Sequence, residues 1–138
     1  QNPSNNKIKA ELPSQNFKDG AYNLSVTERM YLSLKKDVVI VSAIYNTTEE
    51  KQQLMQFRNL TENFNGRVYF SVVKASNSEV ANKYAITETP KILLFGYKTS
   101  RRQVPAAVKG EITEKNVVST ICSTMNKWGE VATYCTSN

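Results

Sequence analysis

Apolar residues recur along this chain with two different spacings, which together predict alternating strands and helices. The run Val38–Ile44 is β-branched and almost wholly apolar, as is typical of a strand covered on both faces. Similar runs at Arg67–Val73 and Lys91–Phe95 predict two further strands. A shorter run, Ile8–Leu12, stops at Pro13 and is the candidate first strand. The pattern predicts an α/β protein whose sheet has a buried centre.

Capping boxes mark the starts of three predicted helices. In a capping box a Ser or Thr is followed three residues later by Glu, and the two side chains satisfy exposed amides at the helix start. The pattern occurs at Ser25, Thr47 and Ser76. Glycine favours a helix end, so the helix that starts at Thr47 is expected to close at Gly66. The helix that starts at Ser76 is short and is expected to run through Tyr84.

Helical spacing completes two of these elements. Over Ser25–Lys35 an apolar residue recurs every fourth position, at Val26, Met30 and Leu34. Thr113 is expected to cap a final helix with one apolar face, formed by Val117, Val118, Ile121, Met125 and Trp128.

The last strands and the C-terminus complete the predicted order. Gln103–Val108 is the expected hairpin partner of the preceding strand, and Pro105 marks it as an edge strand. The order is then β-α-β-α-β-α-β-β-α, which predicts a mixed sheet flanked by helices. At 138 residues the chain is one domain, with a core over about residues 8–128 and a polar tail at 129–138. Because the chain begins at Gln1 rather than Met, we expect a processed form or an excised domain.

One segment adds a family resemblance to this order. Residues 80–95 read VANKYAITETPKILLF, and they resemble the stretch of the thioredoxin family that joins its third helix to the next strand. The resemblance covers roughly residues 36–128 and is most specific at residues 84–90. It implies a thioredoxin-like fold, with Val38–Ile44 as the central strand. It also implies a cis peptide bond between Thr89 and Pro90, beside the family's active site, and X–Pro is the only bond for which cis is inexpensive.

The chain departs from the family where the family performs its chemistry. The family's Cys-x-x-Cys pair falls at residues 48–51, which read TEEK here, and its buried carboxylate falls near Ser42. Thiol–disulfide exchange needs a thiolate, and these positions contain no sulfur. The resemblance therefore predicts a redox-inactive domain, with no catalytic residues at this place.

Composition and charge exclude several other functions. The chain has no histidine, which excludes Ser-His and Cys-His nucleophile pairs and His-liganded metals, and its two cysteines cannot complete a Cys₄ zinc site. We expect neither a metal nor a cofactor. No apolar run approaches the roughly 18 residues of a membrane span. The net charge is +6, and the densest basic cluster lacks the interleaved aromatic residues of a nucleic-acid groove, so we interpret it as a solvated face: Lys98, Arg101, Arg102 and Lys109.

The two cysteines and three glycosylation sequons bear on the compartment. Cys122 and Cys135 are either a structural disulfide that staples the tail to the last helix or a pair of free thiols. A bridge favours the secretory pathway or another extracytoplasmic compartment. Sequons at Asn23, Asn46 and Asn59 are about as many as chance produces, although each is a candidate glycosylation site.

These observations predict a protein- or peptide-binding module that acts as an adaptor, a chaperone-like protein or an assembly subunit. The expected partner site is formed by Tyr45, Asn46, Thr47, Thr48, Glu88, Thr89 and Pro90. There, exposed backbone groups would pair with an extended peptide, and free amides at the helix start would donate hydrogen bonds to an acidic group. The alternative is an intracellular scaffold subunit of a larger complex. An enzyme acting through Tyr45 or Thr48, for example on a glutathione conjugate, would need a helical domain for which the chain has no room.

Overall fold

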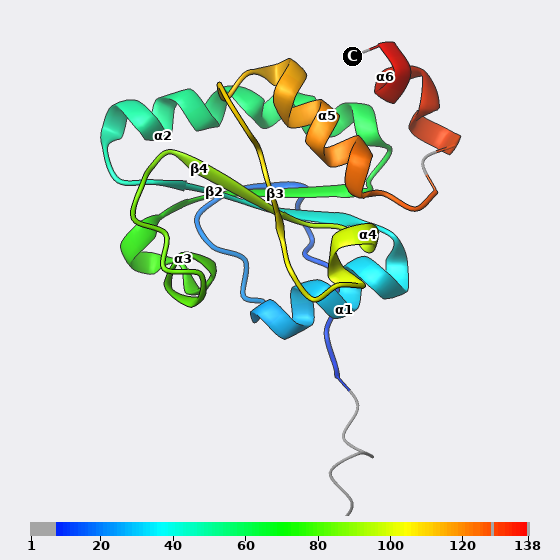
Figure 1. Cartoon of the computed structure of the whole chain (residues 1–138), viewed down its shortest axis with the longest axis horizontal. Coiled ribbons are helices and arrows are strands. Elements are labelled where there is room, and N and C mark those ends of the chain that lie inside the picture. The colour runs from blue at the N-terminus through cyan, green and yellow to red at the C-terminus, as the bar shows by residue number, and fades with distance from the viewer. Residues whose placement is uncertain (1–7, 128, 138) are drawn as a thin grey trace, which may run out of the picture.

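The computed structural model describes residues 8–127 and 129–137. Within them, five strands form one mixed sheet in the order β1-β3-β2-β4-β5 (Figure 1). The first three strands in sequence are parallel, β4 is antiparallel to β2, and β5 is antiparallel to β4. The strands are β1 (Phe17–Asp19), β2 (Val39–Tyr45), β3 (Val68–Lys74), β4 (Lys91–Phe95) and β5 (Ala106–Ala107).

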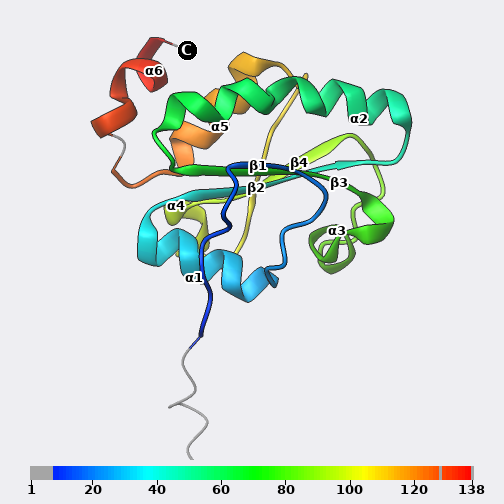
Figure 2. The same cartoon turned by 180° about the vertical axis from the view of Figure 1, so that it is seen from behind.

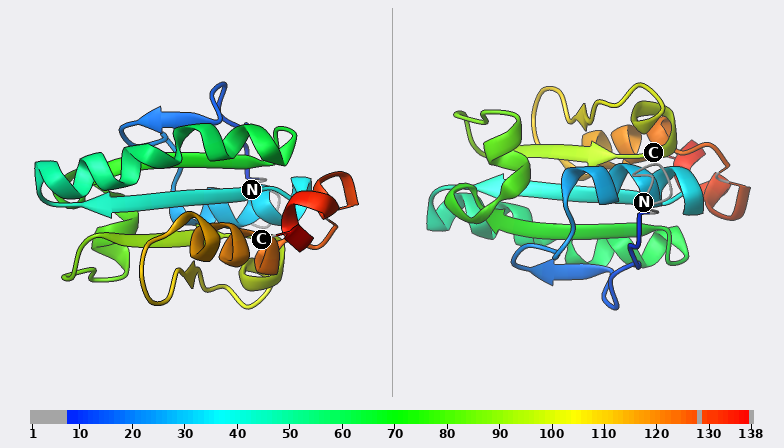
Figure 3. Two further views of the ribbon diagram at one scale, coloured as in Figure 1. Left: turned by 90° about the horizontal axis from the view of Figure 1, so that it is seen from above. Right: turned by 90° about the horizontal axis from the view of Figure 1, so that it is seen from below.

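Helices cover both faces of this sheet (Figures 1 and 2). One face carries α2 (Thr48–Met55), the 3-10 helix η2 (Gln56–Phe64) and α5 (Glu114–Thr124). The opposite face carries α1 (Val26–Lys36), the 3-10 turn η3 (Ala75–Asn77), α3 (Glu79–Lys83) and α4 (Tyr97–Ser100). Seen from above, α2 lies over the β3 side of the sheet and α5 over the β4 side (Figure 3). No helix in the described part of the chain combines the length and apolarity that crossing a bilayer requires.

The central strand is buried on both faces, as its composition predicts. All residues of β2 from Val39 to Ile44 are buried, and the strand pairs along its whole length with β3. Val41 and its alternate neighbours face the core under α2 and α5, whereas Ile40 and Ile44 face the other layer. Each such aliphatic side chain contributes about 1.5–3 kcal/mol by leaving water.

The layer under α1 and α3 is divided by a polar strip. Its apolar residues form two separate clusters, one around Ile44 and Val73 and the other around Ile40 and Tyr69. Between them on the same face lie Ser42 and Ser71, which are opposite each other in the sheet, and the side chain of Arg29 reaches Ser42 from α1. Arg29 is 3% exposed. The helix therefore buries a charged residue that its apolar spacing does not reveal.

The predicted first strand is wrong. Residues 8–12 pair with no strand, and β1 begins instead at Phe17. Two contacts with β3 place it there. The side-chain amide of Asn16 donates to the Val68 carbonyl (2.8 Å), and the Phe17 ring stacks on Phe70 with ring centroids 5.7 Å apart. Ala10 and Leu12 pack instead on the cluster beneath α1, whereas Ile8 is exposed.

Two helix predictions need correction. Thr47 caps its helix as expected, but the segment changes from α-helix to 3-10 helix at Gln56. Ser76 does not start the third helix. Ser78 does, because its hydroxyl accepts the Ala81 amide at 2.9 Å, while residues 75–77 form a separate 3-10 turn.

The predicted β-hairpin at residues 103–108 is also wrong in form. The helical turn α4 follows β4 directly, so the basic residues 98–102 lie on this helix and the turn after it. Only Ala106 and Ala107 return to the sheet as β5. Gln103, in the turn after α4, has a positive φ of 59°, which is not a strand conformation. Few residues then remain for pairing with β4.

The C-terminal segment is ordered rather than a simple polar tail. α5 ends at Thr124, and the predicted member of its apolar face at position 128 lies outside the described residues. The Asp37 carboxylate then accepts the amides of Asn126 (3.0 Å) and Lys127 (2.8 Å). A 3-10 turn η4 (Gly129–Val131) and the helix α6 (Ala132–Ser137) follow.

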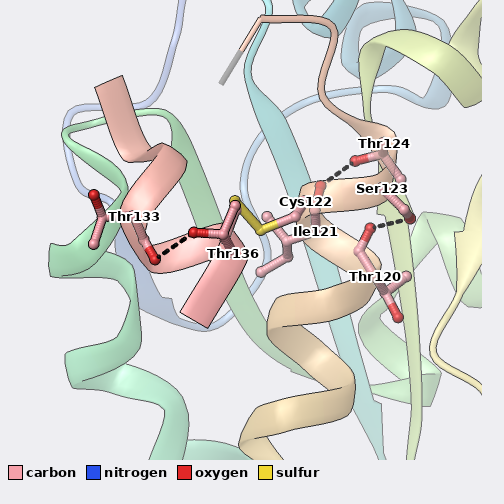
Figure 4. The surroundings of a disulfide bond; sticks show 8 residues. Thr120, Ile121, Cys122, Ser123, Thr124, Thr133 and Thr136 are labelled. Atoms are coloured by element: carbon pink, nitrogen blue, oxygen red, sulfur yellow. Dashed lines mark hydrogen bonds between the residues drawn. A yellow bond between two sulfur atoms is a disulfide. The ribbon is translucent and has the colours of Figure 1, made fainter. Parts of the chain in front are cut away.

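A disulfide joins Cys122 of α5 to Cys135 of α6, as one of the two sequence interpretations predicted. Figure 4 shows the bond crossing between the two helices. Tyr134, beside the bridge, packs edge-on against Phe64 with ring centroids 5.2 Å apart. The bridge and this aromatic contact hold α6 at the opposite end of the sheet from the start of α2 (Figure 1).

The two leucines of α1 provide a test of which face is buried. Leu32 is 0% exposed and Leu34, which the sequence pattern placed on the apolar face, is 37% exposed. We expect Leu32→Ala to lower the free energy of unfolding by about 2–5 kcal/mol, because it leaves a cavity. Leu34→Ala is expected to change it by less than about 1 kcal/mol. Urea denaturation measures both, and equal effects would contradict the observed orientation of α1.

Candidate functional site

The candidate site lies where β2 passes into α2. Thr47 is the N-cap of α2, and its hydroxyl accepts the Glu50 amide at 3.1 Å. In return a Glu50 carboxylate oxygen accepts the Thr47 amide at 3.2 Å and the Asn46 amide at 2.8 Å. The capping box that the sequence predicted therefore fixes the loop between strand and helix.

The same carboxylate oxygen also joins this loop to the turn before β4. The Thr89 hydroxyl donates to Glu50 Oε1 at 2.8 Å, across 39 positions of sequence. Hydrogen bonds that favour the charged form lower a carboxyl pKa. The Asn46 amide and then the Thr89 hydroxyl accordingly hold the pKa of Glu50 below its usual value. Glu50 is thus the residue that connects the two halves of the site.

The turn at Thr89 presents backbone groups that have no hydrogen-bond partner among the described residues. The Thr89–Pro90 peptide bond is cis. Neither the amide nor the carbonyl of Thr89 forms a hydrogen bond with any residue that the structure describes. The same holds for the amides of Thr48 and Glu49 in the first turn of α2. Unpaired groups of this kind can be satisfied by a bound chain.

A broad open groove adjoins this turn on the α3 side. Its volume is about 900 Å³. Asn46 lines one side and Ile86 and Thr87 line another, with the wall completed by the segment from Ala75 to Glu79. Its volume lies within the range of ligand-binding clefts, and its lining is mixed polar and apolar.

Tyr45 does not face the groove. It packs against the core beneath α2, and the Lys51 ammonium lies over its ring, 5.8 Å from the centroid. The Lys51 Nζ is also 3.1 Å from a carboxylate oxygen of Asp19 on β1. The contact with Asp19 is the main reason that the pKa of Lys51 is raised. The second cysteine position of the family pattern is therefore occupied by an ion pair.

The structure brings together only part of the predicted site. Asn46, Thr47 and Thr89 all donate to Glu50, while Pro90 follows in the turn. Thr48 and Glu88 are exposed, and neither side chain contacts the Glu50 carboxylate. Tyr45 is directed elsewhere.

The sequence analysis missed the linking role of Glu50. The capping box identified this residue as a partner of the loop amides, but the spacing of 39 residues to Thr89 left no local signal. The charge of Glu50 also makes an acidic ligand less favourable at this site than the sequence suggested. Glu49 and Glu50 both lie in the first turn of α2, so an incoming acidic group would meet two carboxylates.

The site contains no thiol. Both cysteines of the chain are in the disulfide between α5 and α6, which lies at the far end of the sheet. In residues 8–127 and 129–137, no three His, Cys, Asp or Glu side chains are grouped so that they could hold a metal ion. The arrangement offers hydrogen-bonding backbone groups and a groove.

All three sequon asparagines are exposed. Asn23 precedes α1, Asn59 lies on η2, and Asn46 lies at the groove itself. Their exposure is compatible with glycosylation, and a glycan on Asn46 would stand directly at the candidate site.

Comparisons with known proteins bear on the fold. Neither a protein-family model nor a curated protein sequence matches the chain. Solved structures match at low sequence identity. A single-residue mutant of thioredoxin from Halobacterium salinarum NRC-1 aligns with a TM-score of 0.56 at 16% identity, over 86% of this chain and 98% of that chain.

Two matches come from larger proteins or their domains. The first thioredoxin domain of mouse protein disulfide-isomerase A4 aligns with a TM-score of 0.55 at 15% identity, over 76% of each chain. Full-length ERdj5 aligns with a TM-score of 0.55 at 12% identity, over 75% of this chain, which spans only 16% of the ERdj5 chain. Likeness at this identity establishes the fold. The chain has a thioredoxin-like α/β fold, and the predicted fold class is confirmed.

The two carboxylates in the first turn of α2 provide a matched test of the Glu50 link. We expect Glu50→Gln to lower the urea midpoint at pH 7, because it removes the charge that accepts the Thr89 hydroxyl. Glu49→Gln is the control and should leave the midpoint unchanged, because the exposed side chain of Glu49 forms no hydrogen bond with the described residues. Folding lowers the pKa of Glu50. The contribution of the Glu50 charge to the free energy of unfolding is therefore complete above the pKa of about 4.3 that Glu has in the unfolded chain. It is lost as the pH falls through the lower pKa that Glu50 has in the folded protein.

The difference between wild type and Glu50→Gln should accordingly shrink when denaturation is repeated below about pH 4. An undiminished difference at pH 3, or an equal effect of Glu49→Gln, would contradict the assigned role.

Proposed function

We propose that this chain is a redox-inactive thioredoxin-like module that binds an extended segment of a protein or peptide. The binding surface is the turn at Thr89 together with the adjoining groove and the loop at Asn46. Acting this way, the module serves as an adaptor, a chaperone-like protein or an assembly subunit, and not as an enzyme.

The observation that carries the proposal is the unpaired backbone of Thr89. Its amide and carbonyl have no hydrogen-bond partner in the described part of the chain, and Thr87, two residues earlier, lines a groove of about 900 Å³. An extended chain that adds to such an edge gains main-chain hydrogen bonds of about 0.5–1.5 kcal/mol each. Glu50 supports this geometry because its bond to the Thr89 hydroxyl holds the turn in place.

The absence of a thiol at the site supports the redox-inactive part of the proposal. Residues 48–51 read TEEK, and both cysteines of the chain are bridged elsewhere. A thiol–disulfide exchange at this surface would need a cysteine that the chain does not supply.

The disulfide supports an oxidising, extracytoplasmic compartment for the module. Structural disulfides persist in such compartments and are rare where thiols are kept reduced. This favours the secretory pathway, or another extracytoplasmic location, over an intracellular scaffold. In a glycosylating compartment Asn23 and Asn59 are the sites compatible with binding, because a glycan on Asn46 would cover the groove.

A titration with a permanently unfolded polypeptide tests the binding surface. Reduced and carboxamidomethylated α-lactalbumin serves as the probe, with binding followed by fluorescence anisotropy. We expect Thr89→Arg to weaken binding at least about tenfold, because the new side chain obstructs the turn. Thr136→Arg adds the same side chain at an exposed position of α6 and should bind like wild type.

The competing surface is the basic segment after β4. If Arg101→Glu/Arg102→Glu loses the probe while Thr89→Arg binds normally, the proposed surface is wrong and the basic segment takes its place. Circular dichroism of each variant shows that it is folded before its affinity is interpreted.

Insulin reduction tests the redox-inactive assignment. With dithiothreitol as reductant, the protein is expected to precipitate the insulin B chain no faster than a Cys122→Ser/Cys135→Ser variant. Acceleration that depends on these cysteines would contradict the assignment.

A further inference from the structure

A second polar site lies beneath α1, on the face of the sheet that also carries α3. Arg29 is 3% exposed, and its guanidinium donates three hydrogen bonds. Nε donates to the Leu24 carbonyl at 3.1 Å, Nη1 to the Ser42 hydroxyl at 3.2 Å, and Nη2 to the Tyr22 carbonyl at 3.3 Å. All three acceptors are neutral.

No carboxylate among the described residues forms an ion pair with this buried charge. The ion pairs in the described part of the chain join Lys51 to Asp19 and Arg67 to Asp37, and neither involves Arg29. A buried cation without a paired anion carries a desolvation penalty that no direct ion pair offsets. Burial lowers the pKa of Arg29 to about 10, and the charge of Glu79 offsets only part of this effect.

Two N–H groups of the guanidinium form no hydrogen bond with the described residues. The guanidinium carries five N–H groups, and three of them form the hydrogen bonds above. One free N–H group therefore remains on Nη1 and one on Nη2. Arg29 and Ser42 line a cavity of about 310 Å³. Ser71, which is 0% exposed, lines the same cavity next to Ser42. Two N–H groups on adjacent nitrogens match the two oxygens of a carboxylate.

Two carboxylates face this cavity and restrict what it can accept. Glu28 is already engaged, because it accepts the Ser25 amide at 2.8 Å within the capping box of α1. Glu79 is exposed at the start of α3 and forms no ion pair with Arg29. Their charges disfavour a dianion such as phosphate more strongly than a monoanion.

We propose that this cavity binds a small monocarboxylate, with Arg29 as the charged ligand and Ser42 as a neighbouring hydroxyl. The cavity shares the segment from Asn77 to Glu79 with the wall of the groove near Thr89, but its proposed ligands, Arg29 and Ser42, do not line that groove. The proposal does not depend on the proposed peptide binding. The carboxylate supplies an anion in direct contact with the guanidinium, a contact that neither Glu28 nor Glu79 makes.

Thermal denaturation in acetate tests the site, with ionic strength held constant by exchange against chloride. For a dissociation constant of about 10 mM, 0.1 M acetate should raise the Tm of the wild type by about 3–5 °C. Arg29→Met, which keeps the length of the side chain without its charge, should abolish the shift. The control Arg101→Gln/Arg102→Gln removes an exposed cation pair and should retain it.

Glu79→Gln keeps the proposal falsifiable even if Arg29→Met does not fold. Removing the competing charge should tighten acetate binding by about threefold, or roughly 0.6 kcal/mol. An unchanged or weaker response would overturn the proposal. So would no shift in the wild type, a shift retained in Arg29→Met, or a shift lost in the Arg101/Arg102 control.

The source of the carboxylate is distinguished by comparing probes. A shift with acetate and none with N-acetylglycine assigns the cavity to free small acids. A larger shift with N-acetylglycine than with acetate, absent for its amide, assigns it to the carboxylate at a peptide end. Equal shifts with N-acetylglycine and its amide would contradict carboxylate recognition altogether.

Discussion

The pairing of β2 with β4 determines where the candidate site forms. β2 is buried on both faces, and its antiparallel register places Ile44 opposite Lys91. The chain leaves β2 just after Ile44 and enters β4 just before Lys91, so the loop to α2 and the turn at Thr89 must lie side by side. The polar strip helps to hold this register, since a slip of one residue would turn Ser42 away from Arg29 and into the apolar core under α2 and α5. The site is thus a consequence of how the core packs.

Within that frame, a hydrogen-bonded carboxylate stands where the thioredoxin family has its redox pair. Glu50 accepts from two loop amides and from the Thr89 hydroxyl, and Lys51 pairs with Asp19. These contacts stabilise the same loop and turn without sulfur chemistry. The groups left without a partner among the described residues belong to the backbone at Thr48, Glu49 and Thr89, and they are the basis of the proposed chain-binding surface.

The sequence predicted the features that depend on long apolar runs and on local hydrogen bonds. The central strands and the capping boxes at Ser25 and Thr47 lie close to the expected positions. What it missed depends on contacts between distant segments. Residues 8–12 have strand-like composition, but the bond of Asn16 to Val68 assigns the edge strand to the following segment. Glu50 and Thr89 were each noticed, yet nothing local connects them.

Arg29 is the other instructive case. A charged residue on a surface helix is expected to face solvent, and only the pairing of Ser42 with Ser71 creates a polar place for it beneath α1. That place cannot be recognised until the register of the sheet is known. The face under α1 and α3 is therefore polar at its middle, in contrast to the continuous apolar core under α2 and α5.

A doubly buried sheet thus presents, at the Thr89 turn, backbone groups without a partner among the described residues. Native-state hydrogen exchange followed by NMR measures this directly. The account predicts that the amides of Val41 and Phe70 exchange only through global unfolding, while the amides of Thr48 and Thr89 exchange at nearly unprotected rates. Protection of the Thr89 amide comparable to that of the central strands would contradict the account, because that amide would then already have a partner.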